Sequence, residues 1–374
     1  MYVEYAEIIM YIYENSNWPN FTWDKEIILP LLLQVTSKQS YLLGKMDALG
    51  FDLKEKALLN VLTEDVIKSS EIEGQILNTE QVRSSIAKRL GINIGGDIFV
   101  ERNVEGIVEM MLDATQNYDK EITKDRLLGW QSAMFPSGFS GLYRIKTGNY
   151  RDDSNGPMQV VSGAIGKEKV HYQAPDGDLL DDEMNKLIDY INNLSDATDL
   201  IIKAGIVHLW FVIVHPFEDG NGRIARALTD MLLARSEDSP NRFYSMSAQI
   251  KKVRKSYYKV LEITQSSSVD ITSWLQWFLE NLILAIENSD DLLKSVLQKA
   301  EFWQKNRTVS MNERQIKVLN MILDDFQGNL TTIKWAKICK CSQDTAMRDI
   351  ADLIEKNVLT KQGVARATHY TINY

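Results

Sequence analysis

The chain has 374 residues, of which 44% are hydrophobic and 25% charged, so it can bury a full core and divide into two or three domains. A formal charge of -9 argues against a surface built wholly for nucleic acid. The N-terminus lacks the basic start of a signal peptide, and no apolar run approaches the ~20 residues of a membrane span. Cys339 and Cys341 have no second Cys or His pair at metal-ligand spacing, which argues against a zinc site. We therefore expect a cytoplasmic protein without a membrane partner.

Helical periodicity dominates the chain. The first helix is predicted over residues 24–49, with Asp24 as its N-cap and Gly50 at its end. Further helices are predicted over residues 54–73, 79–90, 99–117, 122–134, 178–194, 197–214, 222–235, 247–264 and 270–305. The pattern predicts a mainly α fold.

One glycine-rich stretch, residues 141–175, breaks the helical pattern. Within it, residues 158–161 and 169–172 flank a turn at 163–166, which predicts a β-hairpin. An isolated hairpin among helices is only marginally stable unless something packs on it. We therefore expect it to serve as a flap over a cleft.

The C-terminal residues 311–374 have the pattern of a separate module. Helices are predicted over residues 313–325, 332–338 and 343–356, with a turn at 339–342 before the third. A β-hairpin ending in residues 368–372 follows. This order resembles a winged helix-turn-helix. The chain is accordingly divided into three predicted domains, residues 1–95, 96–308 and 309–374.

The helix predicted to end at residue 214 leads into the most informative segment. That helix is apolar on nearly every side, so we expect it to lie inside the core. His215 stands where it ends, Pro216 stops its continuation, and Phe217 can anchor the following turn. The sequence Gly220-Asn221-Gly222 then gives a loop whose amides can point at one spot as the next helix begins.

This segment has the composition of a phosphate site with a base beside it. A helix N-terminus behind a glycine-rich turn offers unpaired N–H groups to an anion. Arg223 and Arg226 lie on one face of that helix, and both can bind phosphate oxygens. Asp219 offers the carboxylate oxygen that Mg²⁺ prefers when it bridges phosphates. His215 is the group whose pKa suits proton transfer at neutral pH.

The segment resembles the motif of the Fic family, helical enzymes that typically transfer AMP from Mg-ATP to a Ser, Thr or Tyr hydroxyl. Every defining position from His215 to Arg223 matches, and Arg226 matches a further arginine of regulated members. Residues 18–23 resemble the opening of an N-terminal domain common in bacterial members, and the winged-helix tail recurs in that group. The resemblance implies a protein adenylyltransferase with a Fic-type helical core.

Roles follow residue by residue from this resemblance. It implies that His215 deprotonates the target hydroxyl and that Asp219 holds Mg²⁺, or Mn²⁺, against the ATP phosphates. Arg226 would bind the γ phosphate. The implied phosphate-binding residues are Gly220, Asn221, Gly222, Arg223 and Arg226. The hairpin corresponds to the family's flap, which docks a segment of the target protein. The implied flap residues are Gln159, Val160, Val161, Ser162 and Gly163.

A second motif lies upstream, at residues 69–74. Ser69, Glu73 and Gly74 match the family's inhibitory helix, which is placed at about residues 62–74. A carboxylate paired with Arg226 would occupy the arginine needed for the γ phosphate. The resemblance therefore implies an enzyme inhibited by Glu73. In some members the same glutamate supports removal of AMP, so a reversing activity is compatible with this motif.

Several alternatives stay open. The C-terminal module could bind DNA, as part of a regulator with a nucleotide-sensing Fic domain, or could dock protein or form a homodimer. It carries nine Lys/Arg against seven Asp/Glu, and its predicted recognition helix, 343–356, is acidic. Transfer of a nucleotide other than AMP is also compatible with the motif. Ser69, Tyr150 and Tyr172 are candidate self-modification sites, whereas His208 is expected to be a core residue.

Overall fold

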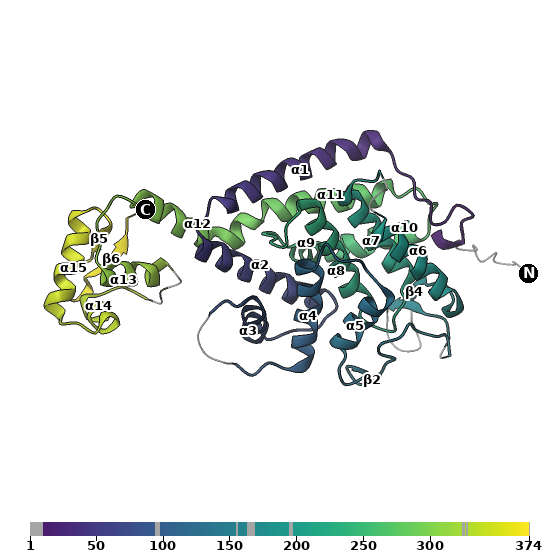
Figure 1. Ribbon diagram of the computed structural model, residues 1–374, viewed down its shortest axis with the longest axis horizontal. Coiled ribbons are helices and arrows are strands. Elements are labelled where there is room, and N and C mark those ends of the chain that lie inside the picture. The colour runs from purple at the N-terminus through teal and green to yellow at the C-terminus, as the bar shows by residue number, and fades with distance from the viewer. Residues whose placement is uncertain are drawn as a thin grey trace, which may run out of the picture. The chain divides into compact units, whose positions relative to one another are not determined.

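The computed structural model describes residues 10–93, 98–154, 156–162, 169–193, 197–323, 326 and 328–373. Over these residues the fold is mainly helical with short antiparallel hairpins, as the sequence predicts (Figure 1). The helices are α1 (Lys25–Asp47), α2 (Phe51–Ile72), α3 (Thr79–Leu90), α4 (Arg102–Gln116), α5 (Lys124–Met134), α6 (Leu180–Asn192), α7 (Leu200–Val214), α8 (Asn221–Glu237), α9 (Met246–Lys252), α10 (Arg254–Gln265), α11 (Thr272–Glu287), α12 (Ser289–Lys305), α13 (Glu313–Leu323), α14 (Thr332–Cys339) and α15 (Gln343–Glu355). The hairpins are β1 (Phe139–Ser140) with β2 (Tyr143–Arg144), β3 (Gln159–Ser162) with β4 (Lys169–Gln173), and β5 (Leu359–Gln362) with β6 (His369–Ile372).

The chain forms two compact units. The first comprises the described residues up to Ala48 together with Leu58–Asp290, and the second comprises Leu49–Ala57 together with the described residues from Asp291 onward. The first unit therefore groups the N-terminal segment with the central one. The division into three domains at residues 95 and 308 stays a prediction.

Helices α7 and α8 form the centre of the first unit and pack on each other, with α4, α6 and α11 against them (Figure 1). Nearly every side chain of α7 is buried, as its apolar sequence predicts. His208 in α7 is a satisfied core residue, because Nδ1 lies 2.9 Å from Thr229 Oγ1 and Nε2 lies 2.8 Å from Tyr257 OH. The prediction for His208 is confirmed. The buried pair α7–α8 holds the loop between its helices in a fixed frame.

The predicted helix limits need correction at two places. The helix expected over residues 247–264 is two helices, α9 and α10, which meet at Val253 with φ -111° and ψ 27°. The pattern over 270–305 is likewise divided, at Asn288, into α11 and α12. At Val253 the apolar pattern continues through a residue with non-helical angles, and at Asn288, whose angles remain in the helical region, it continues through the boundary between the two helices. In contrast, the Asp24 N-cap is confirmed, since its side chain accepts hydrogen bonds from Glu26 N and Ile27 N.

The second unit has its own hydrophobic core, built around the buried side chains of Val318, Trp335, Ile350 and Leu353. Its elements run α13, α14, α15 and then the β5–β6 hairpin, in the order that the sequence predicts. In α15, Asp349 is buried and forms an ion pair with Arg314 at 2.8 Å. At least one acidic side chain of this helix, Asp349, is therefore buried and paired instead of contributing to its exposed face. Its assignment as a winged helix stays a prediction.

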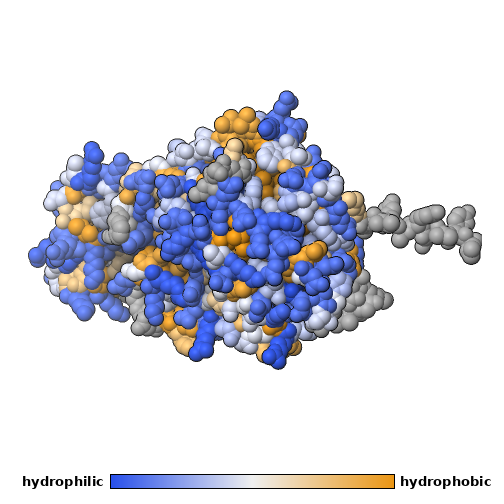
Figure 2. Space-filling view, turned by 45° about the vertical axis from the view of Figure 1, so that its right-hand side comes forward, coloured by the Kyte–Doolittle hydropathy of each residue, from blue (hydrophilic) through white to orange (hydrophobic). Residues whose placement is uncertain are grey.

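The surface of the molecule is mostly polar on the face shown in Figure 2. Hydrophilic residues cover most of that face, and hydrophobic residues are gathered in small separate patches. Among the described residues, no helix combines the length and the apolar composition needed to cross a membrane.

Candidate active site

The predicted motif forms the loop between α7 and α8 and the first turn of α8. His215 caps α7 in the left-handed conformation, with φ 50°. Phe217 is buried, and its backbone N and O are both bound by the Asn221 side chain, at 3.0 and 2.6 Å. Gly220 has φ 95°, and a Cβ there would lie 2.8 Å from Met134 Cε. The loop is therefore held in one shape by its own residues.

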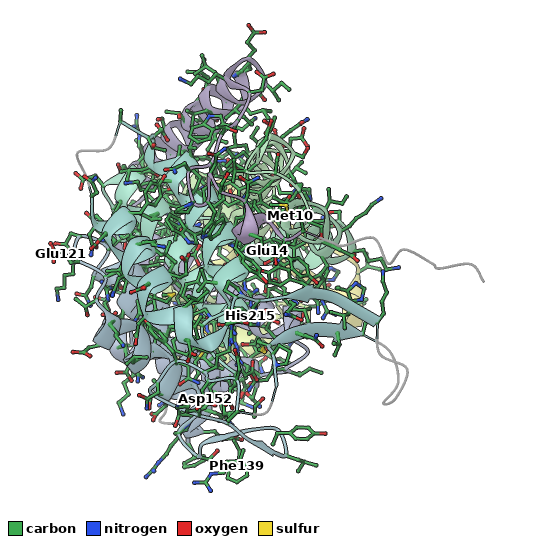
Figure 3. The ribbon with its side chains drawn as sticks, turned by 90° about the vertical axis from the view of Figure 1, so that its right-hand side faces the viewer. Met10, Glu14, Glu121, Phe139, Asp152 and His215 are labelled. Atoms are coloured by element: carbon green, nitrogen blue, oxygen red, sulfur yellow. The ribbon has the colours of Figure 1, made fainter. Side chains whose placement is uncertain are left out.

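The His215 imidazole is neutral at physiological pH. Its Nδ1 lies 3.3 Å from Val212 O, and because a carbonyl oxygen only accepts, Nδ1 carries the proton and Nε2 is the basic nitrogen. Burial lowers the pKa of His215 to about 4, since desolvation disfavours the charged ring. The residue is partly exposed and lines a cavity of about 670 Å³ beside the β3–β4 hairpin, which projects from the helices in Figure 3. His215 can therefore accept a proton from a group in this cavity.

A buried arginine, Arg151, fixes the backbone that carries His215. Its Nε donates to His215 O at 2.8 Å, and its own backbone N donates to Pro216 O at 2.9 Å. An ion pair with Asp153 at 2.7 Å compensates the buried guanidinium. Tyr172 adds a hydrogen bond from its hydroxyl to Ile213 O at 2.7 Å. The sequence interpretation missed Arg151, which positions the histidine from outside the motif.

Arg226 is bound by the end of helix α2. Its Nη2 lies 2.8 Å from Glu73 Oε1, its Nε donates to Ser69 Oγ at 2.9 Å, and its Nη2 donates to Ser69 O at 2.9 Å. The Arg226 side chain is 2% exposed and that of Glu73 is 29% exposed. The Glu73 carboxylate also lies against the N-terminus of α8, where a Cβ on Gly222 would collide with Oε1. A carboxylate therefore already occupies an anion site at this helix end.

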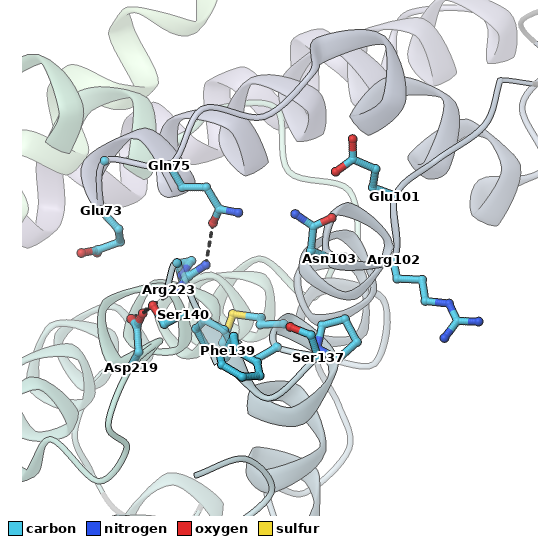
Figure 4. A pocket seen from close by; sticks show the side chains of 15 residues that line it. Glu73, Gln75, Glu101, Arg102, Asn103, Ser137, Phe139, Ser140, Asp219 and Arg223 are labelled. Carbon is cyan, nitrogen blue, oxygen red and sulfur yellow. Dashed lines mark hydrogen bonds and ion pairs between the residues drawn. The ribbon is translucent and has the colours of Figure 1, made fainter. Parts of the chain in front are cut away.

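Arg223 is bound by the residue that follows Gly74. The chain turns at Gly74 with φ 84°, and Gln75 Oε1 then accepts a hydrogen bond from Arg223 Nη1 at 2.8 Å (Figure 4). Arg223 Nη2 also lies 3.4 Å from Asp219 Oδ1. The other oxygen of Asp219 accepts a hydrogen bond from Ser140 Oγ on the β1–β2 hairpin. One short segment, residues 73–75, thus contacts both Arg223 and Arg226.

Two cavities meet at Glu73. The first, of about 840 Å³, is lined by Gln75, Ser140, Asp219 and Arg223 among others. The second, of about 670 Å³, is lined by residues of the β3–β4 hairpin and of α10, together with His215 and Gly222. Glu73 lines both cavities. The Glu73 side chain therefore stands between the cavity lined by His215 and the cavity lined by Asp219 and Arg223.

Two family models match this chain. One, described as "Domain of unknown function (DUF4172)", covers residues 11–92. The other, described as "Fic/DOC family", covers residues 121–233 and so contains the whole loop from His215 to Arg226. The chain contains a Fic domain. Glu73 and Gln75, which contact that domain's arginines, lie within the other match.

Among the relatives of this chain are proteins named protein adenylyltransferase. The chain is 42% identical over 60 residues to "Protein adenylyltransferase fic-1" of Caenorhabditis elegans, a stretch that covers 16% of this chain and 12% of that protein. It is 23% identical over 190 residues to "Protein adenylyltransferase and cysteine protease IbpA" of Histophilus somni (strain 2336), covering 50% of this chain and 4% of that protein. The chain therefore spans only a small part of the length of either relative.

Solved Fic structures share the fold. A Fic family protein from Desulfovibrio desulfuricans G20 matches with a TM-score of 0.56 at 18% identity, over 92% of this chain and 96% of that one. A Fic domain containing signaling protein from Bacteroides thetaiotaomicron VPI-5482 matches with a TM-score of 0.51 at 20% identity, over 71% and 97% of the two chains. At these identities the likeness shows the fold of the Fic domain.

The remaining predicted residues of the Fic domain are distributed around the cavities. Residues 159–162 form strand β3, whose side chains are exposed, whereas Gly163 lies outside the described residues. The Asn221 side chain, predicted to bind phosphate, is committed to Phe217, so in this structure it holds the loop. Its role as a phosphate ligand stays a prediction.

The acidic side chains of the site limit how it could hold a metal ion. Among the described residues, no group of three or more His, Cys, Asp or Glu side chains could hold one. Asp219 is a single carboxylate at the edge of the larger cavity, with its side chain 36% exposed. One carboxylate suffices for Mg²⁺ when substrate phosphates and water supply the other ligands. The residues of the Fic domain therefore fit a metal that arrives with a nucleotide.

Proposed function

We propose that this protein is an adenylyltransferase that transfers AMP from ATP to a Ser, Thr or Tyr hydroxyl of a target protein and releases pyrophosphate. The observation that carries the proposal is that a neutral His215 and an anion site at the start of α8, occupied by the Glu73 carboxylate, line the same cavity. The names of the relatives support this reaction class.

Proton transfer is assigned to His215. Its unprotonated Nε2 would take the proton of the target hydroxyl, while Arg151 and Tyr172 keep the backbone around it in place. The lowered pKa of His215 leaves its imidazole neutral before the reaction. Attack on the α phosphate in line with the departing pyrophosphate then needs mainly positioning and charge neutralisation from the protein.

Charge neutralisation is assigned to the start of α8. The backbone amides from Gly220 to Gly222, together with Arg223 and Arg226, would bind the phosphates of ATP. In this structure the Gly220 amide donates to Asp219 Oδ1, so this bond would have to be exchanged. The present partner of Arg226 is a carboxylate, which stands in for a phosphate oxygen at the same guanidinium. Asp219 would hold Mg²⁺ or Mn²⁺, which supplies charge neutralisation to the phosphates when bound.

We also propose that the observed state is inhibited. For ATP to reach both arginines, Glu73 must leave Arg226 and Gln75 must leave Arg223. A buried arginine exchanges one anion for another, so ATP competes with the chain's own carboxylate. Residues 159–162 of the flap would dock the target segment by strand pairing once the nucleotide is bound.

The position of the label in ATP tests this reaction. The Glu73→Gly variant is incubated with a protein mixture and Mg²⁺, with ATP carrying the label on either the α or the γ phosphate. We expect protein-bound label from α-labelled ATP only, together with release of pyrophosphate. Protein-bound label from γ-labelled ATP would instead show a kinase. Parallel reactions with labelled UTP and GTP test the choice of nucleotide, and a stronger signal from either would refute the AMP assignment.

A further inference from the structure

A second histidine in the smaller cavity is arranged as a base. His171 Nε2 lies 2.6 Å from Ser162 Oγ, and His171 Nδ1 lies 2.9 Å from Glu262 Oε1. Ser162 ends strand β3, His171 belongs to β4, and Glu262 belongs to α10, so three separate elements contribute to the group. Lys169 Nζ lies 3.3 Å from the same Glu262 oxygen.

The hydrogen bonds in this group have one consistent direction. A carboxylate only accepts, so Nδ1 of His171 carries the proton that is donated to Glu262. The hydrogen bond from His171 lowers the pKa of Glu262, which keeps this carboxylate ionised. In the neutral ring with its proton on Nδ1, Nε2 of His171 is the nitrogen that accepts from the Ser162 hydroxyl. A hydroxyl, a base and an orienting carboxylate in this order form the arrangement of an activated nucleophile.

The group faces the cavity that contains the proposed reaction. Ser162, His171 and Glu262 all line the cavity of about 670 Å³ that is also lined by His215 and Gly222. Three basic side chains of α10 line it as well: Arg254, Lys255 and Lys259. A nucleotide bound at the start of α8 would therefore share one cavity with the Ser162 hydroxyl and with cations that favour a phosphate.

Accessibility separates Ser162 from the hydroxyls expected earlier as self-modification sites. Ser69, Tyr150 and Tyr172 are 1%, 8% and 1% exposed, so those expectations were wrong for the folded chain. Ser162 is exposed. The Ser162 hydroxyl is both exposed and hydrogen-bonded to an imidazole. None of the other three hydroxyls is exposed.

We propose that Ser162 is a self-modification site that accepts AMP from ATP, with His171 as its base. The proposal rests on the proposed function, because the same nucleotide site supplies the AMP. Ser162 Oγ forms a bond to the α phosphorus, and its proton passes to His171 Nε2. The bond from the α phosphorus to the bridging oxygen of pyrophosphate breaks, and pyrophosphate leaves with that electron pair. Glu262 stabilises the imidazolium that forms.

Modification at Ser162 has a consequence for the flap. Ser162 belongs to the strand that is proposed to dock the target, and it lines the same cavity as His215. An AMP group attached there would add a negative charge and a nucleoside to that cavity. The modified chain would therefore be blocked for a further cycle, so the reaction limits itself to one AMP at this position.

Peptide mapping tests the proposal. The Glu73→Gly variant is incubated with ATP labelled on the α phosphate and Mg²⁺, with and without an added protein mixture, then digested and analysed by mass spectrometry. We expect AMP on the peptide that contains Ser162. Adding Ser162→Ala should remove that modified peptide, whereas Ser162→Thr, which keeps a hydroxyl, should retain it. Ser154→Ala is the matched control, because Ser154 is exposed but donates to the Asp152 carboxylate rather than to an imidazole.

His171→Gln separates a base from a structural tie between the flap and α10. Glutamine can keep a hydrogen bond to Glu262 but cannot take up the proton, so labelling of Ser162 should slow by about 10²-fold or more. An unchanged rate would overturn the assignment of His171. AMP found only on other residues, or only on added proteins, would overturn the Ser162 site while the proposed function stands. Absence of label from every protein would remove both.

Discussion

The replacement of Glu73 by glycine is expected to raise AMP transfer by about 10- to 150-fold. Glu73 Oε1 lies 2.8 Å from Nη2 of Arg226, whose side chain is 2% exposed. A hydrogen bond to a charged group contributes about 1.5–3 kcal/mol, and each 1.4 kcal/mol corresponds to a factor of ten. Without the Glu73 carboxylate, ATP no longer has to displace a contact of that free energy from Arg226. The substitution also removes the side chain that stands between the two cavities.

Initial rates of label transfer from α-labelled ATP, measured over a range of ATP concentrations, check this magnitude. Glu73→Gln keeps the shape of the side chain without its charge, so its rate should fall between those of the wild type and the glycine variant. Glu71→Gln is the control, because Glu71 lies in the last turn of α2, two residues before Glu73, but pairs with Lys68 at 2.9 Å. Equal rates for wild type and Glu73→Gly, with the variant folded and Glu71→Gln unchanged, would refute the inhibitory role.

Three further predictions concern residues around the same site. Gln75→Ala should raise the rate by about fivefold, because one neutral hydrogen bond to Arg223 is worth about 1 kcal/mol, and Gln75→Glu should lower it. Identical rates in both variants would argue against an inhibitory contact between Gln75 and Arg223. The pKa of His215, about 4, keeps its basic form present down to mildly acid pH, so the rate of Glu73→Gly at saturating ATP should stay level from pH 8 to about 5.5, and a loss centred near 6.5 would contradict this. Ser140→Ala removes the hydroxyl that binds Asp219, so the affinity for Mn²⁺ should fall by about 10- to 100-fold. Electron paramagnetic resonance measures this affinity in the presence of a non-hydrolysable ATP analogue. An unchanged affinity would show that Ser140 does not orient the carboxylate.

The sequence predicted the part of the site that is local in the chain. The buried helix α7, its end at His215 and the start of α8, one residue before the predicted 222, follow from short-range patterns of apolar residues, proline and glycine, whereas the left-handed conformation of His215 was not predicted. The contact of Glu73 with Arg226 spans much of the chain, and its expectation came from a family motif. Such a pairing is not visible in periodicity, because helices separated in sequence meet only through the packing of the whole unit.

The residues that were missed share this difficulty. Gln75 binds Arg223 across 148 residues, Ser140 binds Asp219 across 79, and Arg151 binds His215 O across 64. Each is a common polar residue in a loop, at a helix end or in a two-residue strand, where local sequence gives no sign of a partner. The β1–β2 hairpin that carries Ser140 was also not expected as a separate element, since strands of two residues leave almost no alternating pattern.

The central claim is that His215 transfers a proton while AMP passes from ATP to a protein hydroxyl. The most direct measurement is the intact mass of the proteins in a reaction with Mg²⁺ and ATP, catalysed by Glu73→Gly or by Glu73→Gly/His215→Ala. We predict that an added target protein gains the mass of AMP with the single variant, and that this gain on the added protein is absent with the double variant. The same gain with both variants, or the mass of a phosphate in place of AMP, would contradict the account.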